Sequence, residues 1–509
     1  MSHSPLFSRI KQSLRQARLE RLNCVDQASP RPQEAAHLTR RRFLSAAIMG
    51  SGALLAGCAL TPLDAPQKPG APRVAIVGAG LAGLNCAYQL KRAGVRATLY
   101  EASERAGGRC FSKTGLLNAG QTVELGGEFI DTGHADMLAL CRELGLSLLD
   151  MSHDSAVINE AYFLDGRHYS ESEVIEAFKA FVPRLESDLA AMETPEGLAQ
   201  LDALSLSAYL DAIGCAGWLR KLLVAAFVTE FGLDEGVQTS LNLISMIGTD
   251  VAEGFKVFGE SDERFKVVGG NQQVALGLAQ RLDGQIEFER RLRRLSRQGS
   301  AYRLDFDKGQ ATADVVVLAL PFTLLRDVEI RLELPALKWR AIRELGYGMC
   351  TKVMLGTTSR PWRQQGYSGS VYSDQSFQLA WDNARLQAGA GAGITLYSGG
   401  SAAMRAGEGS VQEALKRLLP GLELAFAGLT QAANQNQHRM HWPAHPLARC
   451  AYSAYTVGQW STLSGHEFEP VNDLYFCGEH CSEDFQGFLN GAAETGRRAA
   501  DLVVAALRG

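Results

Sequence analysis

Three glycines near the start of the chain are spaced as a pyrophosphate site requires. Gly78, Gly80 and Gly83 form G-x-G-x-x-G within the segment VAIVGAGLAG. The first glycine permits a tight turn, the second lets the backbone approach a pyrophosphate, and the third allows a helix to pack closely on a strand. Leu81 and Ala82 follow in the first turn of the expected helix, whose N-terminal amide groups favour an anion. The spacing therefore predicts a dinucleotide-binding turn.

An acidic residue, Glu101, follows the turn at the distance expected in a dinucleotide-binding unit. Apolar residues 74–77 and 95–100 predict two strands, and the residues from the turn to about 93 predict the helix between them. Glu101 ends the second strand, at the distance where a carboxylate accepts hydrogen bonds from a ribose hydroxyl. A lone glycine motif would be a weak signal, but the five features together predict a Rossmann-like unit.

Two further glycine pairs follow this unit. The run ERAGGRC contains Gly108 and Arg109, and the run VELGGEFID contains Gly126 and Gly127. This order of motifs resembles the flavin monoamine oxidase family, the amine oxidoreductases that include polyamine and L-amino-acid oxidases. The resemblance extends from about residue 72 to the C-terminus and is strongest at both ends. It implies that the cofactor is FAD.

The resemblance assigns roles to these residues. Arg109 would reach the pyrophosphate, with an ordinary surface arginine as the alternative. Gly126 and Gly127 would bring the backbone to the isoalloxazine ring, with Glu128 and Phe129 beside it; an ordinary turn is the alternative.

The C-terminal segment LYFCGEHCSEDFQGFLNGAAETGRRAADLV resembles the closing FAD segment of the same family. Residues 474–477 predict a buried strand, Gly478 opens space after it, and Glu479 can accept from a ribitol hydroxyl. A helix from about Leu489 would direct its positive N-terminus at the flavin, which stabilises negative charge on the reduced ring. Asn490 departs from the family, whose members usually have glutamate there.

Two more features concern how the cofactor is held. Leu292, in FERRLRRL, stands where the family presents an apolar side chain to the adenine, and an ordinary strand residue is an equal alternative. Some relatives bind flavin covalently through a cysteine directly before the first aromatic residue of the substrate cage. In this chain Ala451 holds that place and Cys450 lies one residue away. The sequence therefore predicts non-covalent FAD.

Lys352 is the candidate catalytic residue. The run GMCTKVMLGTTSRPW resembles the family strand whose lysine holds a water molecule at flavin N5. An ammonium group there would favour reduced oxygen species and the anionic reduced flavin. A strand lysine whose amine reaches solvent is the alternative.

Aromatic residues are the candidates for the substrate site. Tyr452 and Phe488 fall where relatives place two aromatic walls that flank the substrate amine. Such walls orient an amine and attract positive charge. Trp381 and Trp460 are further pocket candidates, and core packing is the alternative for all four residues.

The sequence also bears on the substrate. An L-amino-acid oxidase needs a cation, usually arginine, to bind the carboxylate. Several relatives place it just after the glycine pair, where this chain has Glu128 and Phe129. This favours an amine without a carboxylate, although an arginine from elsewhere, such as Arg220, is an alternative.

We therefore predict FAD-dependent oxidation of an amine to an imine and then an aldehyde, with reduction of O2 to H2O2 and release of ammonia. Two alternatives stay open. One is an L-amino-acid oxidase or related monooxygenase, and the other is a flavin-bearing binding protein without turnover.

Composition limits the expected partners. The chain has 509 residues, of which 46% are hydrophobic, so it can bury the core of more than one domain. Its net charge of −4 and the lack of a basic patch with interleaved aromatic residues argue against nucleic acid. No zinc-type Cys/His spacing occurs, so no metal is predicted. The expected partners are a small-molecule amine and O2, with a homo-oligomer left open.

The expected fold class is α/β: a Rossmann-like FAD-binding domain intertwined with an α+β substrate-binding domain. Chains of the resembled family pass back and forth between two domains. Residues 72–147, 267–341 and 446–509 are assigned to the FAD-binding domain, and residues 148–266 and 342–445 to the substrate domain. The apolar spacing in 172–192 and 206–231 predicts that the segment 148–266 is mostly helical.

The first 60 residues lie outside the predicted fold. TRRRFL at residues 39–44 resembles a twin-arginine export signal, and the apolar run after it is too short and weakly apolar for a membrane span. LAGC, ending at Cys58, resembles a lipobox, which would place a lipid on Cys58. Residues 61–71 form a linker. We expect export to the periplasm by the twin-arginine route, with membrane association only through the signal or a lipid anchor at Cys58.

Overall fold

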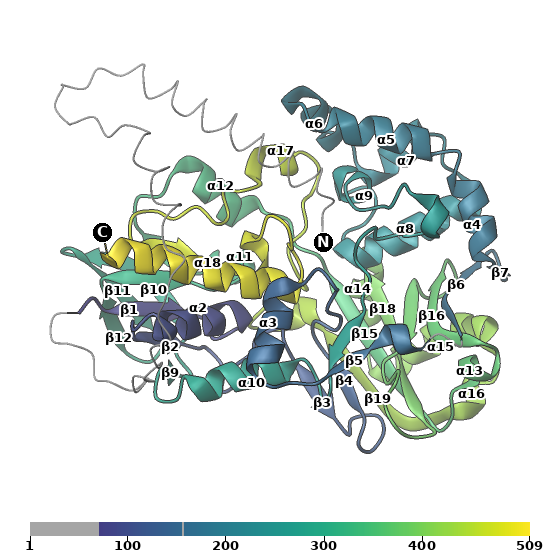
Figure 1. Cartoon of the computed structure of the whole chain (residues 1–509), viewed down its shortest axis with the longest axis horizontal. Helices are drawn as coiled ribbons and strands as arrows, with labels where there is room; N and C mark the ends of the chain where they lie inside the picture. Colours follow the sequence, from purple (N-terminus) through teal and green to yellow (C-terminus); the bar gives the residue numbers. More distant parts are fainter. Residues whose placement is uncertain (1–70, 155–156, 509) are drawn as a thin grey trace, which may run out of the picture.

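The computed structural model describes residues 71–154 and 157–508, which form two halves that each contain a large β-sheet (Figure 1). Within these residues the first half is built on a five-stranded parallel sheet in the order β20-β13-β1-β2-β9. The sequences VAIV in β1 and VVVL in β13 are buried throughout, as in parallel sheets that are covered on both faces. The strands span β1 Val74–Val77, β2 Ala97–Tyr100, β9 Ile286–Glu287, β13 Val315–Leu318 and β20 Leu474–Phe476.

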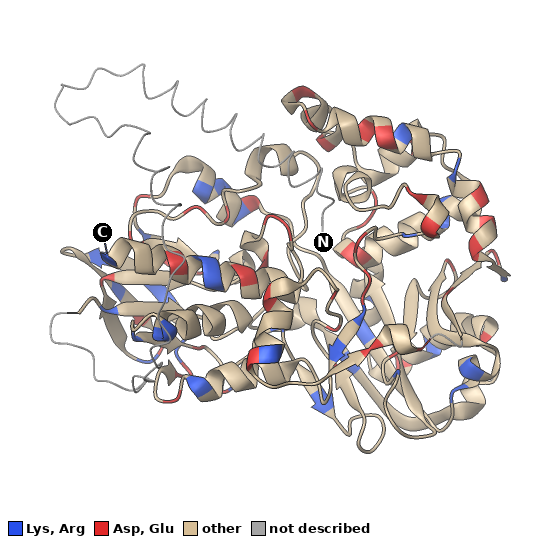
Figure 2. Ribbon diagram, viewed as in Figure 1, with Lys and Arg blue, Asp and Glu red and all other residues tan. Residues whose placement is uncertain are grey.

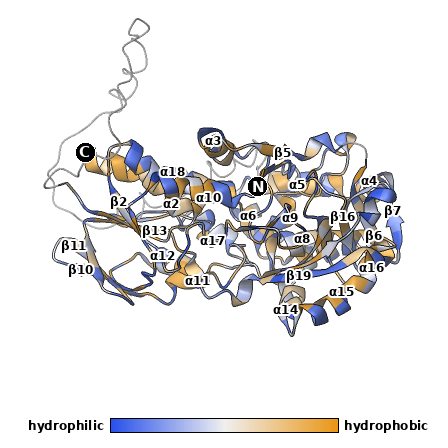
Figure 3. Cartoon of the chain, turned by 90° about the horizontal axis from the view of Figure 1, so that it is seen from below, coloured by the Kyte–Doolittle hydropathy of each residue, from blue (hydrophilic) through white to orange (hydrophobic). Residues whose placement is uncertain are grey.

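Helices cover one face of this sheet, and a second sheet covers the other. Val74 and Ile76 of β1 belong to a core shared with α2, α10 and α18. Ala75 and Val77 point to the opposite side of the strand, into a core shared with β10 and β11. Figure 3 shows α2 and α18 on one side of the parallel sheet and β10 and β11 on the other. These layers span α2 Leu81–Arg92, α3 Ala135–Glu143, α10 Gln272–Arg281, α18 Leu489–Arg508, β10 Leu292–Gln298, β11 Ala301–Phe306, β12 Gln310–Ala313 and β14 Glu329–Arg331.

Within the described residues the second half is built on a seven-stranded mixed sheet in the order β19-β15-β18-β17-β16-β6-β7. α8 packs on one face of this sheet, and the apolar side of α15 packs on the other. The strands span β6 Ile158–Leu164, β7 Arg167–Tyr169, β15 Cys350–Thr357, β16 Tyr367–Ser373, β17 Leu379–Asp382, β18 Ala392–Gly399 and β19 Ala433–His441. The helices of this half span α4 Glu171–Phe178, α5 Val182–Ala191, α6 Pro195–Asp202, α7 Leu206–Ala212, α8 Gly217–Phe231, α9 Leu241–Ile244, α13 Pro361–Gln364, α14 Gly400–Gly407, α15 Val411–Ala425 and α16 Leu429–Ala432.

Short elements join the two halves. β3 pairs with β4, and β5 pairs with β8, each as an antiparallel pair. The remaining elements span β3 Ser112–Thr114, β4 Thr122–Glu124, β5 Leu148–Asp150, β8 Phe265–Val267, α11 Phe322–Leu325, α12 Ala336–Glu344 and α17 Trp460–Leu463, with 3-10 turns at Met151–His153, Val251–Glu253, Trp442–Ala444 and Glu479–Cys481.

The expected α/β fold class is confirmed, and the structure refines its details. The helical spacing in residues 172–192 and 206–231 corresponds to pairs of shorter helices, α4 with α5 and α7 with α8. Gly214 adopts a left-handed φ of 71° and separates α7 from α8. The segment 148–266 also supplies β6 and β7 to the large sheet, which the sequence did not indicate. The exact domain limits stay a prediction.

The predicted export signal, the lipobox with Cys58 and the linker up to residue 70 lie outside the described residues. Among residues 71–154 and 157–508, no helix has both the length and the apolar character needed to cross a membrane. Figure 2 shows Lys and Arg interspersed with Asp and Glu on both halves of the molecule.

The turn from β1 into α2 predicts a difference in stability between two glycine variants. A Cβ atom on Gly83 would lie 2.0 Å from the carbonyl oxygen of Gly78, whereas a Cβ atom on Gly80 would meet nothing within 4 Å. Gly83→Ala should therefore destabilise the cofactor-free protein by about 1–3 kcal/mol, the usual cost of overpacking. Gly80→Ala should leave it unchanged. Equal thermal unfolding midpoints for the two cofactor-free variants would contradict this packing.

Candidate active site

A cavity of about 1480 Å³ runs from the glycine turn of the first half to the large sheet of the second. It brings together most of the residues that the sequence singled out, although they come from distant parts of the chain. The predicted residues that line it are Gly78, Gly80, Leu81, Ala82, Glu101, Gly108, Arg109, Gly126, Gly127, Glu128, Phe129, Lys352, Trp381, Tyr452, Gly478, Glu479, Phe488 and Leu489.

Three predicted residues do not line this cavity. Gly83 lies behind the turn, where its lack of a side chain lets α2 approach Gly78. The side chain of Leu292 is buried in the core between the sheets of the first half, which agrees with the ordinary strand residue that the sequence left as an equal alternative. Trp460 is buried in α17 and packs against Tyr455 with ring centroids 5.4 Å apart, which agrees with the core-packing alternative.

The first end of the cavity is formed by the β1–α2 turn and the end of β2. Gly78 has a left-handed φ of 103°, which makes the turn possible. The carboxylate of Glu101 accepts from the backbone N–H of Ala79 at 2.8 Å and from the N–H and hydroxyl of Ser103, each at 2.8 Å. Glu101 therefore ties the turn to the loop after β2, at the position predicted for a ribose contact.

An ion pair at the wall of the cavity joins two residues that are far apart in the sequence, Arg109 and Glu479. The Nη1 atom of Arg109 donates to Glu479 at 2.8 Å and to the carbonyl of Ala451 at 2.7 Å. The Glu479 carboxylate also accepts from the Ser453 hydroxyl at 2.7 Å and from the N–H of Gly487 at 3.0 Å. Burial opposes ionisation of Glu479, but Arg109 outweighs it, so the pKa of this carboxyl lies below its ordinary value. The predicted contacts of Arg109 and Glu479 with the cofactor stay predictions.

The Gly126–Gly127 pair permits a close approach between three segments. A Cβ atom on Gly126 would lie 1.7 Å from the carbonyl oxygen of Arg109, and one on Gly127 would lie 2.8 Å from the side chain of Leu489. Leu489 is the first residue of α18, as predicted. Only glycines let this loop fit between Arg109 and the start of α18, where they expose backbone to the cavity.

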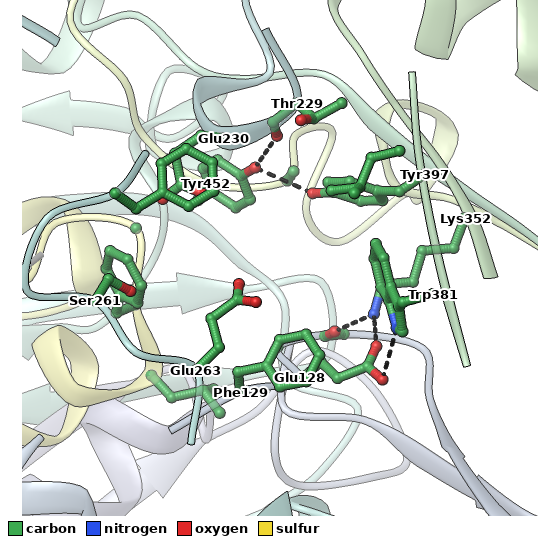
Figure 4. Close-up of a pocket in the computed structure, with 18 of the residues that line it drawn as sticks. Glu128, Phe129, Thr229, Glu230, Ser261, Glu263, Lys352, Trp381, Tyr397 and Tyr452 are labelled. Carbon is green, nitrogen blue, oxygen red and sulfur yellow. Dashed lines mark hydrogen bonds and ion pairs between the residues drawn. The ribbon is translucent and has the colours of Figure 1, made fainter. Parts of the chain in front are cut away.

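Lys352 lies in a buried ion cluster at the wall of the cavity (Figure 4). Its Nζ atom donates to the carbonyls of Glu124 and Gly126, each at 3.0 Å, and to Oε2 of Glu128 at 2.7 Å. The other oxygen of Glu128 accepts from Nζ of Lys266 at 2.8 Å and from the indole N–H of Trp381 at 2.9 Å.

This cluster carries a positive charge. Burial alone would raise the pKa of Glu128, but the two lysine ammonium groups outweigh it and lower that pKa to about 2. Glu128 is therefore ionised at neutral pH. The Glu128 carboxylate lies between the side chains of Lys266 and Lys352, and burial raises the pKa of the neighbouring Glu124 carboxyl to about 7. Glu124 therefore offsets only part of the positive charge beside the glycine pair, where the resemblance placed the flavin ring.

Aromatic side chains line the cavity next to this cluster. The Tyr452 hydroxyl donates to the carbonyl of Thr229 at 3.0 Å and lies 3.0 Å from the Tyr397 hydroxyl. The rings of Trp381 and Tyr397 meet edge to face with centroids 5.4 Å apart. Phe488 lines the same cavity. These rings form a chamber wall of the kind that attracts an amine.

The sequence missed two contributors to this wall. Tyr397 comes from β18, and Lys266 comes from β8. A lysine inside the apolar run FKVV was a signal for Lys266, because a buried lysine requires a partner. No sequence signal distinguishes Tyr397 from an ordinary strand residue.

A model of flavin-containing amine oxidoreductases matches residues 81–504. The chain belongs to this family. It is 25% identical over 471 residues to polyamine oxidase 4 of Oryza sativa subsp. japonica, which covers 89% of this chain and 93% of the relative. It is 23% identical to an L-amino acid dehydrogenase of Synechocystis sp., over 85% of this chain and 94% of the relative. In structure it is similar to cyclohexylamine oxidase from Brevibacterium oxydans IH-35A, with a TM-score of 0.76, 21% identity, and 86% and 100% of the two chains covered.

FAD is the cofactor of this family, and the residues present fit it. The space above Gly80 is open, and the backbone of Gly78, Gly80, Leu81 and Ala82 faces the cavity at the N-terminus of α2. Cys450 is buried, lies near Thr323 and is not among the described residues that line the cavity. Non-covalent binding of FAD stays a prediction.

The open space above Gly80 predicts a selective effect on cofactor binding. Gly80→Ala places a methyl group where the pyrophosphate would lie, without disturbing the turn itself. The FAD dissociation constant should rise by about ten-fold or more, since that change corresponds to 1.4 kcal/mol. Titration of the cofactor-free variant with FAD, followed by flavin fluorescence, measures this constant. An unchanged value would remove the turn from the FAD site.

Proposed function

We propose that this protein oxidises an amine without a carboxylate to an imine, which water converts to an aldehyde and ammonia, while O2 is reduced to H2O2. One observation supports this most strongly. A single cavity joins the dinucleotide-binding turn to a chamber walled by Tyr452, Tyr397, Trp381 and Phe488. Flavin amine oxidation needs that continuity, because the substrate carbon must reach the flavin ring in a space that excludes water.

The arginines along the cavity argue against a carboxylate on the substrate. Among the described residues that line it, the arginines are already engaged: Arg105 with the carbonyl of Gly108, Arg109 with Glu479, and Arg385 with Asp154. Arg220, the alternative cation considered above, lies outside the lining and pairs with Asp211 and Glu235. A substrate carboxylate would therefore lack a free guanidinium.

The residues of the chain have distinct tasks in this reaction. When bound, FAD supplies the redox chemistry, taking hydrogen and two electrons from the carbon beside the amine and passing the electrons to O2. Tyr452 and Phe488 would hold the amine between aromatic faces. The positive charge of the Lys266–Glu128–Lys352 cluster would disfavour an ammonium ion near the flavin, so that the reacting amine is neutral. The same charge would stabilise negative charge that develops during reduction.

Lys352 should matter most when the reduced cofactor reacts with oxygen. Lys352→Met should slow reoxidation on the order of ten-fold or more, with a smaller effect on reduction by the amine. Stopped-flow absorbance separates the two half-reactions. Lys266→Met is a matched control, because it removes the other lysine from the same carboxylate. Equal reoxidation rates in wild type and Lys352→Met would exclude Lys352 from this role.

The proposed reaction is tested by products rather than by cofactor content alone. Purified FAD-loaded protein should consume O2 and release equal amounts of H2O2 and ammonia with aliphatic amines, and far less with L-amino acids. Turnover confined to L-amino acids would favour the amino-acid oxidase alternative. A yellow protein that turns over neither class would favour the binding-protein alternative.

We also propose that the protein is exported by the twin-arginine route to the periplasm and anchored through a lipid on Cys58. The support is TRRRFL at residues 39–44 and LAGC ending at Cys58. A flavoprotein must fold around its cofactor before export, which this route permits. Replacing Arg40, Arg41 and Arg42 by lysine should retain the protein in the cytoplasm. Cys58→Ala should instead release the exported protein from membranes. Membrane association that persists in Cys58→Ala would overturn the anchor.

A further inference from the structure

Two acidic side chains in the cavity have no hydrogen-bond or ion-pair partner among residues 71–154 and 157–508. Glu230 is the penultimate residue of α8, and Glu263 lies two residues before β8. Both line the cavity, and Figure 4 shows them beside Tyr452 and Phe129, respectively. Among the described residues, none donates a hydrogen bond or forms an ion pair with either carboxyl group.

The other acidic residues in the described lining differ in this respect. Each of them accepts a hydrogen bond from a side chain or backbone N–H of the described chain. They are Glu101, Glu128, Glu160, Glu171, Glu173, Asp262, Asp382 and Glu479. The carboxyl groups of Glu230 and Glu263 are therefore available to bind a ligand in the cavity.

Glu230 is partly exposed and Glu263 is exposed, and both line the cavity. A ligand that fills the cavity displaces water from these carboxyl groups, which then require a hydrogen bond or an opposite charge. Burial raises the pKa of Glu230 to about 8. Burial, together with the nearby charge of Glu230, raises the pKa of Glu263 well above its ordinary value. A cation between the two groups would relieve both effects.

The loop before β8 places the side chain of Glu263 in the cavity. Glu263 has a left-handed φ of 45°, which costs a non-glycine residue about 1–3 kcal/mol. Buried Asp131 holds the loop in place. It accepts from the N–H of Glu263 at 3.0 Å and from the hydroxyl of Ser261 at 2.7 Å.

The aromatic wall adjoins these carboxyl groups. Glu230 directly follows Thr229, whose carbonyl accepts from the Tyr452 hydroxyl. Phe129 lies on the other side of the cavity, with its ring close to Trp381 at a centroid distance of 6.0 Å. Aromatic faces and carboxylates are together the chemistry that binds an alkylammonium ion.

Resting on the proposed amine oxidation, we propose that Glu230 and Glu263 form a second cation subsite, which binds the distal ammonium ion of an aliphatic diamine or polyamine while the other amine meets the flavin. The two carboxyl groups then hold the charged ammonium ion. The Lys266–Glu128–Lys352 cluster favours a neutral form of the amine that meets the flavin.

A matched pair of substrates tests this subsite. 1,4-Diaminobutane and pentylamine have the same length, but pentylamine replaces the distal ammonium ion by a methyl group. The wild-type kcat/KM for the diamine should exceed that for pentylamine by about a hundred-fold or more, because a site built for a polar group rejects an analogue that lacks it.

Variants then locate the effect. Glu230→Gln combined with Glu263→Gln should reduce the diamine preference to less than about ten-fold and leave kcat/KM for pentylamine nearly unchanged. Asp262→Asn is the control. Asp262 lies next to Glu263 in the same loop and also lines the cavity, but its carboxylate already accepts hydrogen bonds from Thr132. Calorimetric titration of each FAD-loaded variant with 1,4-diaminobutane, after the flavin has been fully reduced with dithionite and under anaerobic conditions, measures binding without oxidation of the amine.

The outcomes separate the two proposals. Oxidation of pentylamine as fast as the diamine by wild type would overturn the subsite and leave amine oxidation standing. Equal losses for both substrates in the double variant would also overturn the subsite. Failure of wild type to oxidise either amine would overturn the proposed function itself. Thermal unfolding and flavin content verify that the glutamine variants are folded.

Discussion

The arrangement of the cavity depends on one buried carboxylate, Glu128, held between two lysine ammonium groups. A charge removed from water is tolerated only when its hydrogen bonds are complete, and losing one partner of such a group typically costs 3–5 kcal/mol. Glu128 meets this condition through Lys266, Lys352 and Trp381. These partners come from β8, β15 and β17, so a single ion cluster fixes the glycine loop against both halves of the molecule.

The cavity is lined by charged groups of both signs. The lysine-rich cluster lies beside the glycine loop where the flavin ring is expected, and two carboxyl groups without a partner among the described residues, Glu230 and Glu263, line the same cavity. An amine that carries charge at one end and is neutral at the other would fit this arrangement. The Arg109–Glu479 pair adds rigidity rather than net charge, because its two groups neutralise each other and secure the loops that contain Ala451 and Gly487.

Sequence reasoning found residues that meet in one cavity where its signals are local. The glycine spacing around Gly80, the carboxylate of Glu101 and the helix that begins at Leu489 are each constrained by short-range backbone geometry, and all of them line the cavity. Sequence reasoning could not assign a residue to the cavity or the core where this depends on tertiary packing. Leu292 and Trp460 are buried in a core instead, and Tyr397, Glu230 and Glu263 reach the cavity only through tertiary packing.

The central claim is that an amine delivers its electrons to the flavin in this cavity. The most direct measurement is an anaerobic titration of the FAD-loaded protein with 1,4-diaminobutane, followed by the absorbance of oxidised flavin. The account predicts that about one equivalent of the amine abolishes this absorbance and that an aldehyde and ammonia appear. Absorbance that stays constant with every amine, or that falls only with L-amino acids, would contradict it.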